Sequence, residues 1–142
     1  MNLRALTVGD VMTRDPVTLG PEDSLSRAME VMRRHAIRRV PVVLSGRLVG
    51  LLAQGDLNRA HPSILDSSPE EFQRVVDETT VSRIMISSPI TTTESAPLVE
   101  AVRTLHSTKF GALPVVQGDT VVGILTDADL IRTLWEILAR AD

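Results

Sequence analysis

The sequence predicts an α/β (α+β) fold built from two copies of one βαββα unit. The first observation is an internal repeat: a shift of 73 positions (129 minus 56) aligns residues 8–57 with residues 81–130 without a gap. The second is that each copy alternates apolar runs typical of strands with the three-and-four spacing of amphipathic helices. The third is size, because a unit of about fifty residues buries too little surface to be stable alone. We therefore expect both copies to form one pseudo-symmetric domain.

Each copy starts with a short extended segment that begins at a proline, at residues 16–18 and 89–91. Proline fixes its own φ angle and biases the preceding residue away from helix. An amphipathic helix follows, whose buried face is predicted from apolar residues three and four positions apart. These residues are Leu25, Ala28, Met29 and Met32 in the first copy and Leu98, Ala101, Val102 and Leu105 in the second.

Two strands come next in each copy. Residues 40–44 and 47–52 are nearly continuous in Val and Leu, and a tight turn at Ser45 and Gly46 joins them. The second copy repeats this pattern around Gly118 and Asp119. Such continuous runs are typical of a sheet that is covered on both faces.

A helix closes each copy, beginning near Gln54 and near Asp127. In the second copy its apolar stripe is wider than one buried face needs. The stripe either caps the core or forms a subunit interface, and the sequence leaves both interpretations open. It comprises Leu130, Ile131, Leu134, Trp135, Ile137 and Leu138.

The segment between the copies is predicted to be a helical connector. Ser68 can cap a helix, Pro69 suits the first helical position, and Glu71 can reach back to the cap. The predicted organisation is residues 1–60 as the first repeat, residues 61–80 as the connector and residues 81–142 as the second repeat.

Composition excludes several classes of function. A formal net charge of -3 gives no global field for nucleic acid or for an anionic membrane. No apolar run approaches the roughly 18 residues that span a bilayer, and the first residues lack a signal-peptide pattern, so we expect a cytoplasmic protein. The lack of cysteine rules out disulfides, thiolate metal sites and a cysteine nucleophile. One Trp, two Phe and no Tyr provide no stacking platform for single-stranded nucleic acid.

The same ordered motifs occur in both copies. The first has Asp10-Val11-Met12-Thr13, Val40-Pro41-Val42-Val43, Leu48-Val49-Gly50-Leu51-Leu52 and Asp56-Leu57, and the second has Leu113-Pro114-Val115-Val116 and Val121-Val122-Gly123-Ile124-Leu125-Thr126-Asp127-Ala128-Asp129-Leu130. This order resembles the CBS domain, named after cystathionine beta-synthase, in the tandem arrangement called a Bateman module. The resemblance implies two units about a pseudo-twofold axis, with clefts between them for AMP, ADP, ATP or S-adenosylmethionine. It also implies a regulatory, energy-sensing homodimer that acts on an unknown protein. No cofactor is required, and Mg²⁺ is expected only alongside ATP.

The segment from Gly123 to Asp129 is similar to the strand-to-helix motif of the family. There the aspartate binds the ribose and the threonine meets phosphate, roles that fall on Asp129 and Thr126. A helix N-terminus suits this role because its free backbone donors and its dipole attract an anion. The alternative is that Thr126 is an ordinary helix cap. The first copy keeps Asp56 but has Ala53 at the position of Thr126, so its cleft is the weaker candidate.

Arg38 and Arg39 lie where family members that bind phosphate often carry basic residues. The family fold implies that they serve the ligand held by Asp129 of the other copy. Arginine suits the task because its planar guanidinium grips phosphate oxygens in pairs. The alternative is a solvated helix end. The family motif also suggests an apolar purine slot, although each of its residues is individually more typical of a core: Val17, Val40, Ile90, Phe110, Leu113 and Pro114.

Two rival functions remain. An enzyme would need a base, nucleophile or metal at a workable spacing, and the histidines His35, His61 and His106 have no spacing typical of zinc sites. Asp127 and Asp129 could hold Mg²⁺, but two carboxylates at a helix start are usually a cap. The other rival is a protein-interaction adaptor that binds no small molecule.

Overall fold

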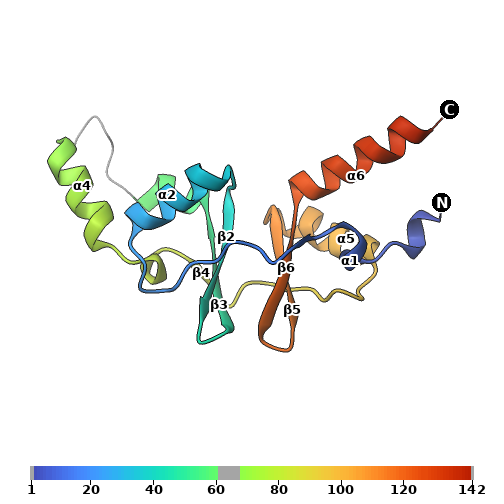
Figure 1. The fold of residues 1–142 in the computed structure, drawn as a ribbon, viewed down its shortest axis with the longest axis horizontal. Coiled ribbons are helices and arrows are strands. Elements are labelled where there is room, and N and C mark those ends of the chain that lie inside the picture. The colour runs from blue at the N-terminus through green and yellow to red at the C-terminus, as the bar shows by residue number, and fades with distance from the viewer. Residues whose placement is uncertain (1, 61–67, 142) are drawn as a thin grey trace. The chain divides into compact units, whose positions relative to one another are not determined.

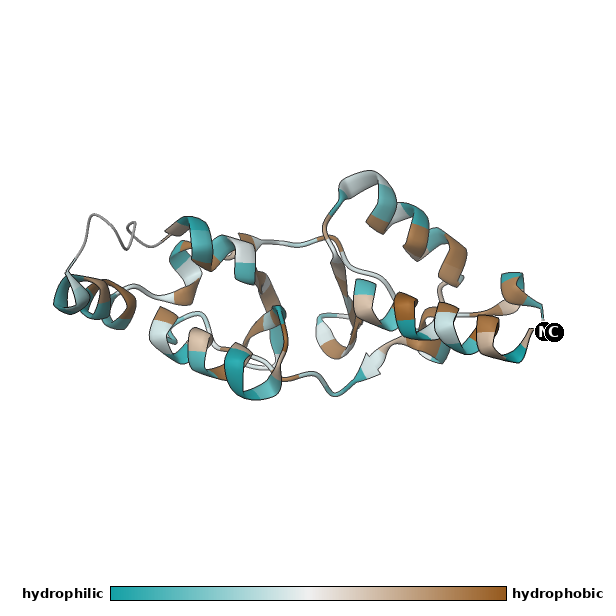
Figure 2. Cartoon of the chain, turned by 90° about the horizontal axis from the view of Figure 1, so that it is seen from above, coloured by the Kyte–Doolittle hydropathy of each residue, from teal (hydrophilic) through white to brown (hydrophobic). Residues whose placement is uncertain are grey.

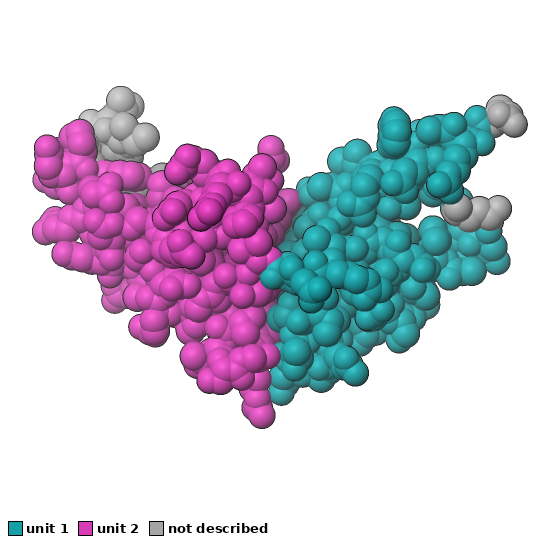
Figure 3. Space-filling model, in the orientation of Figure 1, with its two compact units in different colours: residues 1–16, 90–142 teal, residues 17–89 magenta. Residues whose placement is uncertain are grey.

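The computed structural model describes residues 2–60 and 68–141. Contacts between Cα atoms divide the chain into two compact units (Figure 3). Unit 1 comprises residues 1–16 and 90–142, and unit 2 comprises residues 17–89. Each unit therefore contains pieces of both sequence repeats.

Unit 2 contains a three-stranded antiparallel sheet in the order β2-β3-β4 (Figure 1). Its strands are β2 (Arg39–Leu44), β3 (Arg47–Ala53) and β4 (Ile86–Ser87). Its helices are α2 (Leu25–His35), α3 (Gln54–Ala60), α4 (Pro69–Glu78) and the 3-10 helix η2 (Val81–Arg83). One apolar core joins these elements and includes Leu25, Val40, Leu52, Leu57 and Val76.

Unit 1 repeats the plan with a sheet in the order β1-β6-β5. Its strands are β1 (Thr13–Arg14), β5 (Ala112–Gln117) and β6 (Thr120–Thr126). Its helices are α1 (Val8–Val11), α5 (Leu98–Thr108), α6 (Asp127–Arg140) and the 3-10 helix η1 (Leu3–Ala5). A second core includes Val8, Leu98, Leu113, Val115 and Leu125.

The predicted fold class is confirmed: each unit mixes helices with a small sheet. The tight turn between β2 and β3 holds Ser45 at φ 51° and Gly46 at φ 81°, the left-handed conformation that two-residue hairpins favour. The connector helix is also present, and Ser68 caps it by accepting a hydrogen bond from the Glu71 backbone N–H at 3.1 Å.

The extended segments predicted at residues 16–18 and 89–91 form no strand of their own in the structure. The paired strands β1 and β4 end before Pro16 and Pro89, not after them. Asp15 and Ser88, at φ 47° and φ 51°, turn the chain out of each strand just ahead of the proline. Beyond the prolines the chain makes only isolated bridges, Leu19 to Val42 and Thr92 to Val115.

The matching glycines Gly50 and Gly123 let these short strands approach. A Cβ atom at Gly123 would lie 2.7 Å from Met12 Sδ and 2.9 Å from the Thr13 carbonyl oxygen. At Gly50 it would overlap Met85 Sδ and lie 3.0 Å from the Ile86 carbonyl oxygen. A side chain at either position would therefore push β1 or β4 away from its sheet.

Candidate functional site

The end of β6 and the start of α6 form a reciprocal cap around Asp129. The Asp129 backbone N–H donates to Thr126 Oγ1 at 3.3 Å, and the Thr126 backbone N–H donates to Asp129 Oδ2 at 2.9 Å. The Thr126 hydroxyl also donates to Oδ2 at 3.1 Å. The helix cap predicted for Thr126 is therefore present.

Two further groups from unit 1 bind the other oxygen of Asp129. Thr13 in β1 donates its hydroxyl to Oδ1 at 2.8 Å, and Arg132 donates from Nη1 at 3.3 Å. Arg132 also donates to the Val11 carbonyl at 2.9 Å, which ties α6 to α1. With 2% of its surface exposed, Asp129 is a buried carboxylate with donors on both oxygens. A buried charge needs such partners to be tolerated.

The matching carboxylate of unit 2 has fewer donors. Asp56 is 8% exposed and accepts from the Ala53 backbone N–H at 2.9 Å and from Arg59. Under the shift of 73 positions, Ala53 replaces Thr126 and Ile86 replaces Thr13, so both hydroxyls are missing. The sequence predicts the loss at Ala53 but not the one at Ile86. The repeat alignment, which pairs Ile86 with Thr13, was the signal that could have revealed it.

Arg38 and Arg39 both lie in unit 2, beside the start of α3. The Arg38 carbonyl accepts from the Gln54 backbone N–H at 2.8 Å, and Arg39 is paired with Ala53 across β2 and β3. Arg38 is exposed and Arg39 is half-buried. Asp129 belongs to the other unit, so the role of the two arginines at its cleft stays a prediction.

The residues of the predicted purine slot fall into two groups. Val40 and Leu113 are fully buried in the separate cores of units 2 and 1, and Val17 packs against the same core as Val40. Pro114 is buried in β5. Ile90 and Phe110 are 42% and 38% exposed. Among these residues, only Ile90 and Phe110 present a large apolar surface that their own unit leaves uncovered.

A hollow of about 680 Å³ lies in unit 1, and none of the predicted site residues lines it. Its lining includes Arg14 and Glu94, which form an ion pair at 2.8 Å. The hydrogen bond and charge of Arg14 hold the pKa of Glu94 below its ordinary value, and Glu94 raises the pKa of Arg14 in return. Both side chains are about half exposed, so the pair is a surface ion pair.

The described residues contain no cluster of three or more His, Asp or Glu side chains that could hold a metal ion. Neither do they include a helix long and apolar enough to cross a bilayer. His35 and His106 are exposed in the last turns of α2 and α5, and His61 lies outside the described residues.

Comparison with known proteins gives a consistent result. The family model of the CBS domain matches residues 8–63 and 81–136. A CBS domain-containing protein of Dictyostelium discoideum is 30% identical over 134 residues, which cover 92% of each chain. The chain spans less than half the length of several other curated relatives.

Solved structures agree with this match. CBSX2, a protein of Arabidopsis thaliana, was solved in complex with AMP and superposes with a TM-score of 0.75 at 32% identity, over 92% of this chain and 97% of that chain. The CBS domain pair of protein MJ0100 was solved with 5'-methylthioadenosine and S-adenosyl-L-methionine. It superposes with a TM-score of 0.76 at 27% identity, over 91% of this chain and 99% of that chain.

Proposed function

We propose that this chain, which belongs to the CBS domain family, is a non-catalytic regulatory module that binds an adenine nucleotide. The nucleotide binds in the cleft between the repeats, and its presence is passed to a partner protein by contact. Two relatives with ligands in their solved structures support the ligand class, because both carry adenosine compounds. The observation that carries the proposal in this chain is the buried carboxylate of Asp129 at the start of α6, with hydrogen-bond donors to both of its oxygens.

In this proposal Asp129 accepts a hydrogen bond from the ribose. Its Oδ1 already accepts a hydrogen bond from the hydroxyl of Thr13, which is an exposed residue. A ribose hydroxyl can take the place of the Thr13 hydroxyl, because it forms the same kind of hydrogen bond to the carboxylate. Thr126 and the N-terminus of α6, where the helix dipole favours an anion, face the phosphate. Arg38 and Arg39 add paired donors for phosphate oxygens, and the exposed Ile90 and Phe110 contact the purine.

The two carboxylates supply a matched test by thermal denaturation. Wild type, Asp129→Ala and Asp56→Ala are each melted with AMP, ADP, ATP and S-adenosylmethionine. A ligand at a hundredfold its dissociation constant adds about 2.7 kcal/mol of stability. We expect Asp129→Ala to lose this gain and Asp56→Ala to keep most of it. Each variant removes one helix-capping carboxylate, so loss of a cap by itself does not separate them.

A double variant tests the phosphate contacts. Arg38→Ala with Arg39→Ala should weaken ATP far more than adenosine, because only ATP presents phosphate oxygens. An equal loss for both ligands would mean that the arginines support the fold instead. If no adenine compound shifts the melting of the wild type at millimolar concentration, the adaptor function replaces the sensor function.

The assembly proposed with this function is a homodimer formed through one side of α6. Ile131, Trp135 and Leu138 recur at helical spacing on this side and are 68%, 68% and 64% exposed. Figure 2 shows hydrophobic residues recurring along α6, the helix that leads to the C-terminus. Exposed apolar surface of this kind is typical of a protein interface.

A further inference from the structure

Each unit has a hollow beside its first long helix, and the two hollows are related by the sequence repeat. In unit 2 a hollow of about 480 Å³ is lined by Ser26, Met29 and Val76, among others. In unit 1 a hollow of about 440 Å³ is lined by Val99, Val102 and Leu3, the residues 73 positions away from those three. The two hollows therefore mark equivalent surfaces of the two units, and they can be compared for what covers each surface.

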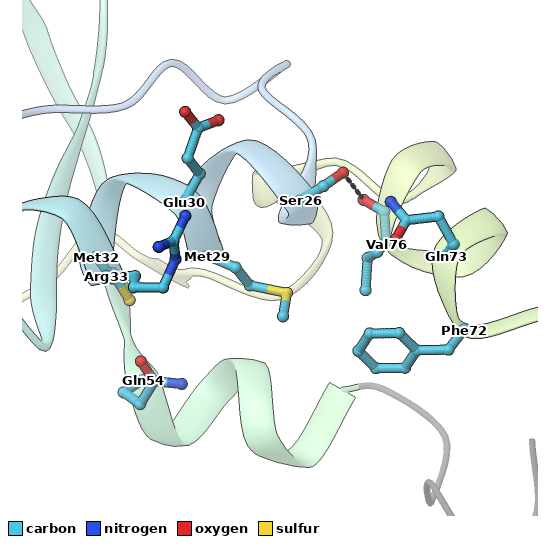
Figure 4. A pocket seen from close by; sticks show the side chains of 9 residues that line it. All are labelled: Ser26, Met29, Glu30, Met32, Arg33, Gln54, Phe72, Gln73 and Val76. Carbon is cyan, nitrogen blue, oxygen red and sulfur yellow. Dashed lines mark hydrogen bonds between the residues drawn. The ribbon is translucent and has the colours of Figure 1, made fainter. Parts of the chain in front are cut away.

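In unit 2 the helix α4 covers this surface. Val76 of α4 is buried at 2% exposure, and Phe72, one turn earlier, packs against the core of the unit (Figure 4). A hydrogen bond also holds α4 against α2, because the Ser26 hydroxyl on α2 donates to the Val76 carbonyl oxygen at 3.1 Å. The occupant of this surface is thus an amphipathic helix that presents apolar residues four positions apart.

In unit 1 the same surface is largely uncovered. The described residues supply only η1, three residues long, at the position of the last turn of α4. Leu3 is 51% exposed there, whereas its counterpart Val76 is 2% exposed. Val99 and Val102 of α5 are 52% and 37% exposed. Since Val99 replaces Ser26, the polar contact of unit 2 is also lost and the surface is more apolar.

The other wall of this groove comes from a separate side of α6. Leu130, Leu134 and Ile137 line the groove, at spacings of four and three residues. Ile131, Trp135 and Leu138 do not line it and lie about 100° further around the helix. The groove is therefore distinct from the side of α6 assigned to the homodimer.

We infer that the groove lined by Leu3, Val99, Val102, Leu130, Leu134 and Ile137 binds an amphipathic helix of a partner protein. The helix carries apolar residues four positions apart, which take the places of Phe72 and Val76 in unit 2. The α4 helix of the same chain supports this occupant, because it shows what the repeat-related surface accepts. The inference identifies the partner-binding surface of the proposed module, and it rests on that proposal only for the regulatory role of the partner.

A peptide with the sequence of residues 68–80 serves as the probe, since it contains α4 and its cap. The labelled peptide is titrated with the full chain, without nucleotide, and followed by fluorescence anisotropy. We expect saturable binding that Val102→Asp weakens at least about tenfold, equal to about 1.4 kcal/mol. Replacing Phe72 and Val76 of the peptide with alanine should weaken binding similarly. Leu44→Asp is the matched control. Leu44 is an exposed apolar residue (53%) at the end of β2 in unit 2, and it does not line the groove.

Three outcomes would overturn the inference. The first is no saturable binding at about 1 mM peptide, and the second is equal binding to wild type and Val102→Asp. The third is a change of oligomeric state in Val102→Asp, measured by light scattering, because a second copy would then cover the groove. Val99→Asp repeats each measurement at a more exposed position, so that a folding defect of one variant is recognised. Nucleotide binding is measured separately by thermal shift, so its failure would leave the groove result intact.

Discussion

Thr126→Ala should lower the free energy of unfolding by about 2 kcal/mol. Loss of a helix N-cap costs about 1 kcal/mol. The same hydroxyl also donates to the buried Asp129 carboxylate at 3.1 Å, and a hydrogen bond to a charged group contributes about 1.5 kcal/mol or more. The full sum is not expected, because Thr13, Arg132 and the Thr126 backbone N–H remain as donors to the carboxylate.

The matched change in the other repeat should act in the opposite direction. Ala53→Thr supplies the missing hydroxyl at the start of α3 and should raise the free energy of unfolding by about 0.5 to 1 kcal/mol. This estimate is smaller than the loss at Thr126 because it counts the helix cap alone and no second hydrogen bond to the Asp56 carboxylate.

Urea denaturation followed by circular dichroism measures both effects as shifts in midpoint at constant slope. Thr126→Ser keeps the hydroxyl and should stay within about 0.5 kcal/mol of wild type. The reasoning is refuted if Thr126→Ala and Thr126→Ser are equally stable, or if Ala53→Thr is less stable than wild type.

Three further predictions concern other contacts. Thr13→Val keeps the shape of the side chain but removes one donor to Asp129, and should cost about 1 kcal/mol in urea denaturation; an unchanged midpoint would contradict the bond. Glu94→Gln should slightly reduce the free energy of unfolding at pH 7. The difference from wild type should disappear as the pH falls through the lowered pKa of Glu94, because the stability that the charged carboxylate contributes is lost when it is protonated. A difference that persists at pH 2 would contradict the role of the Arg14 charge. If the proposed homodimer forms through α6, Trp135→Asp should make the protein monomeric in light scattering, and an unchanged mass would contradict an interface on this side of α6.

Local patterns allowed much of the fold to be predicted. The spacing of apolar residues gave α2 and α5, the turn residues gave both hairpins, and Ser68 marked the start of α4. These features depend on residues within a few positions of each other, so one sequence contains the information. The reciprocal cap of Thr126 and Asp129 is local in the same sense.

Contacts between distant segments could not be predicted in this way. Thr13 and Asp129 are 116 residues apart, and they meet because β1 pairs with β6 of the other repeat. The sequence gives no periodic signal for a paired strand of two residues such as β1 or β4. The Thr13 hydroxyl, one of the donors that distinguish Asp129 from Asp56, could therefore be placed beside the carboxylate only once the pairing of β1 with β6 was known.

The exchange of short strands also determines where the chain can be cut. A fragment of residues 17–89 contains β2, β3 and β4, so it retains every strand of its sheet. A fragment that ends at the repeat boundary near residue 80 lacks β4 and leaves one edge of β3 without its hydrogen-bonding neighbour. Expression of isolated halves, domain insertion and circular permutation should therefore use Pro16 and Pro89 as junctions rather than the limits of the sequence repeats.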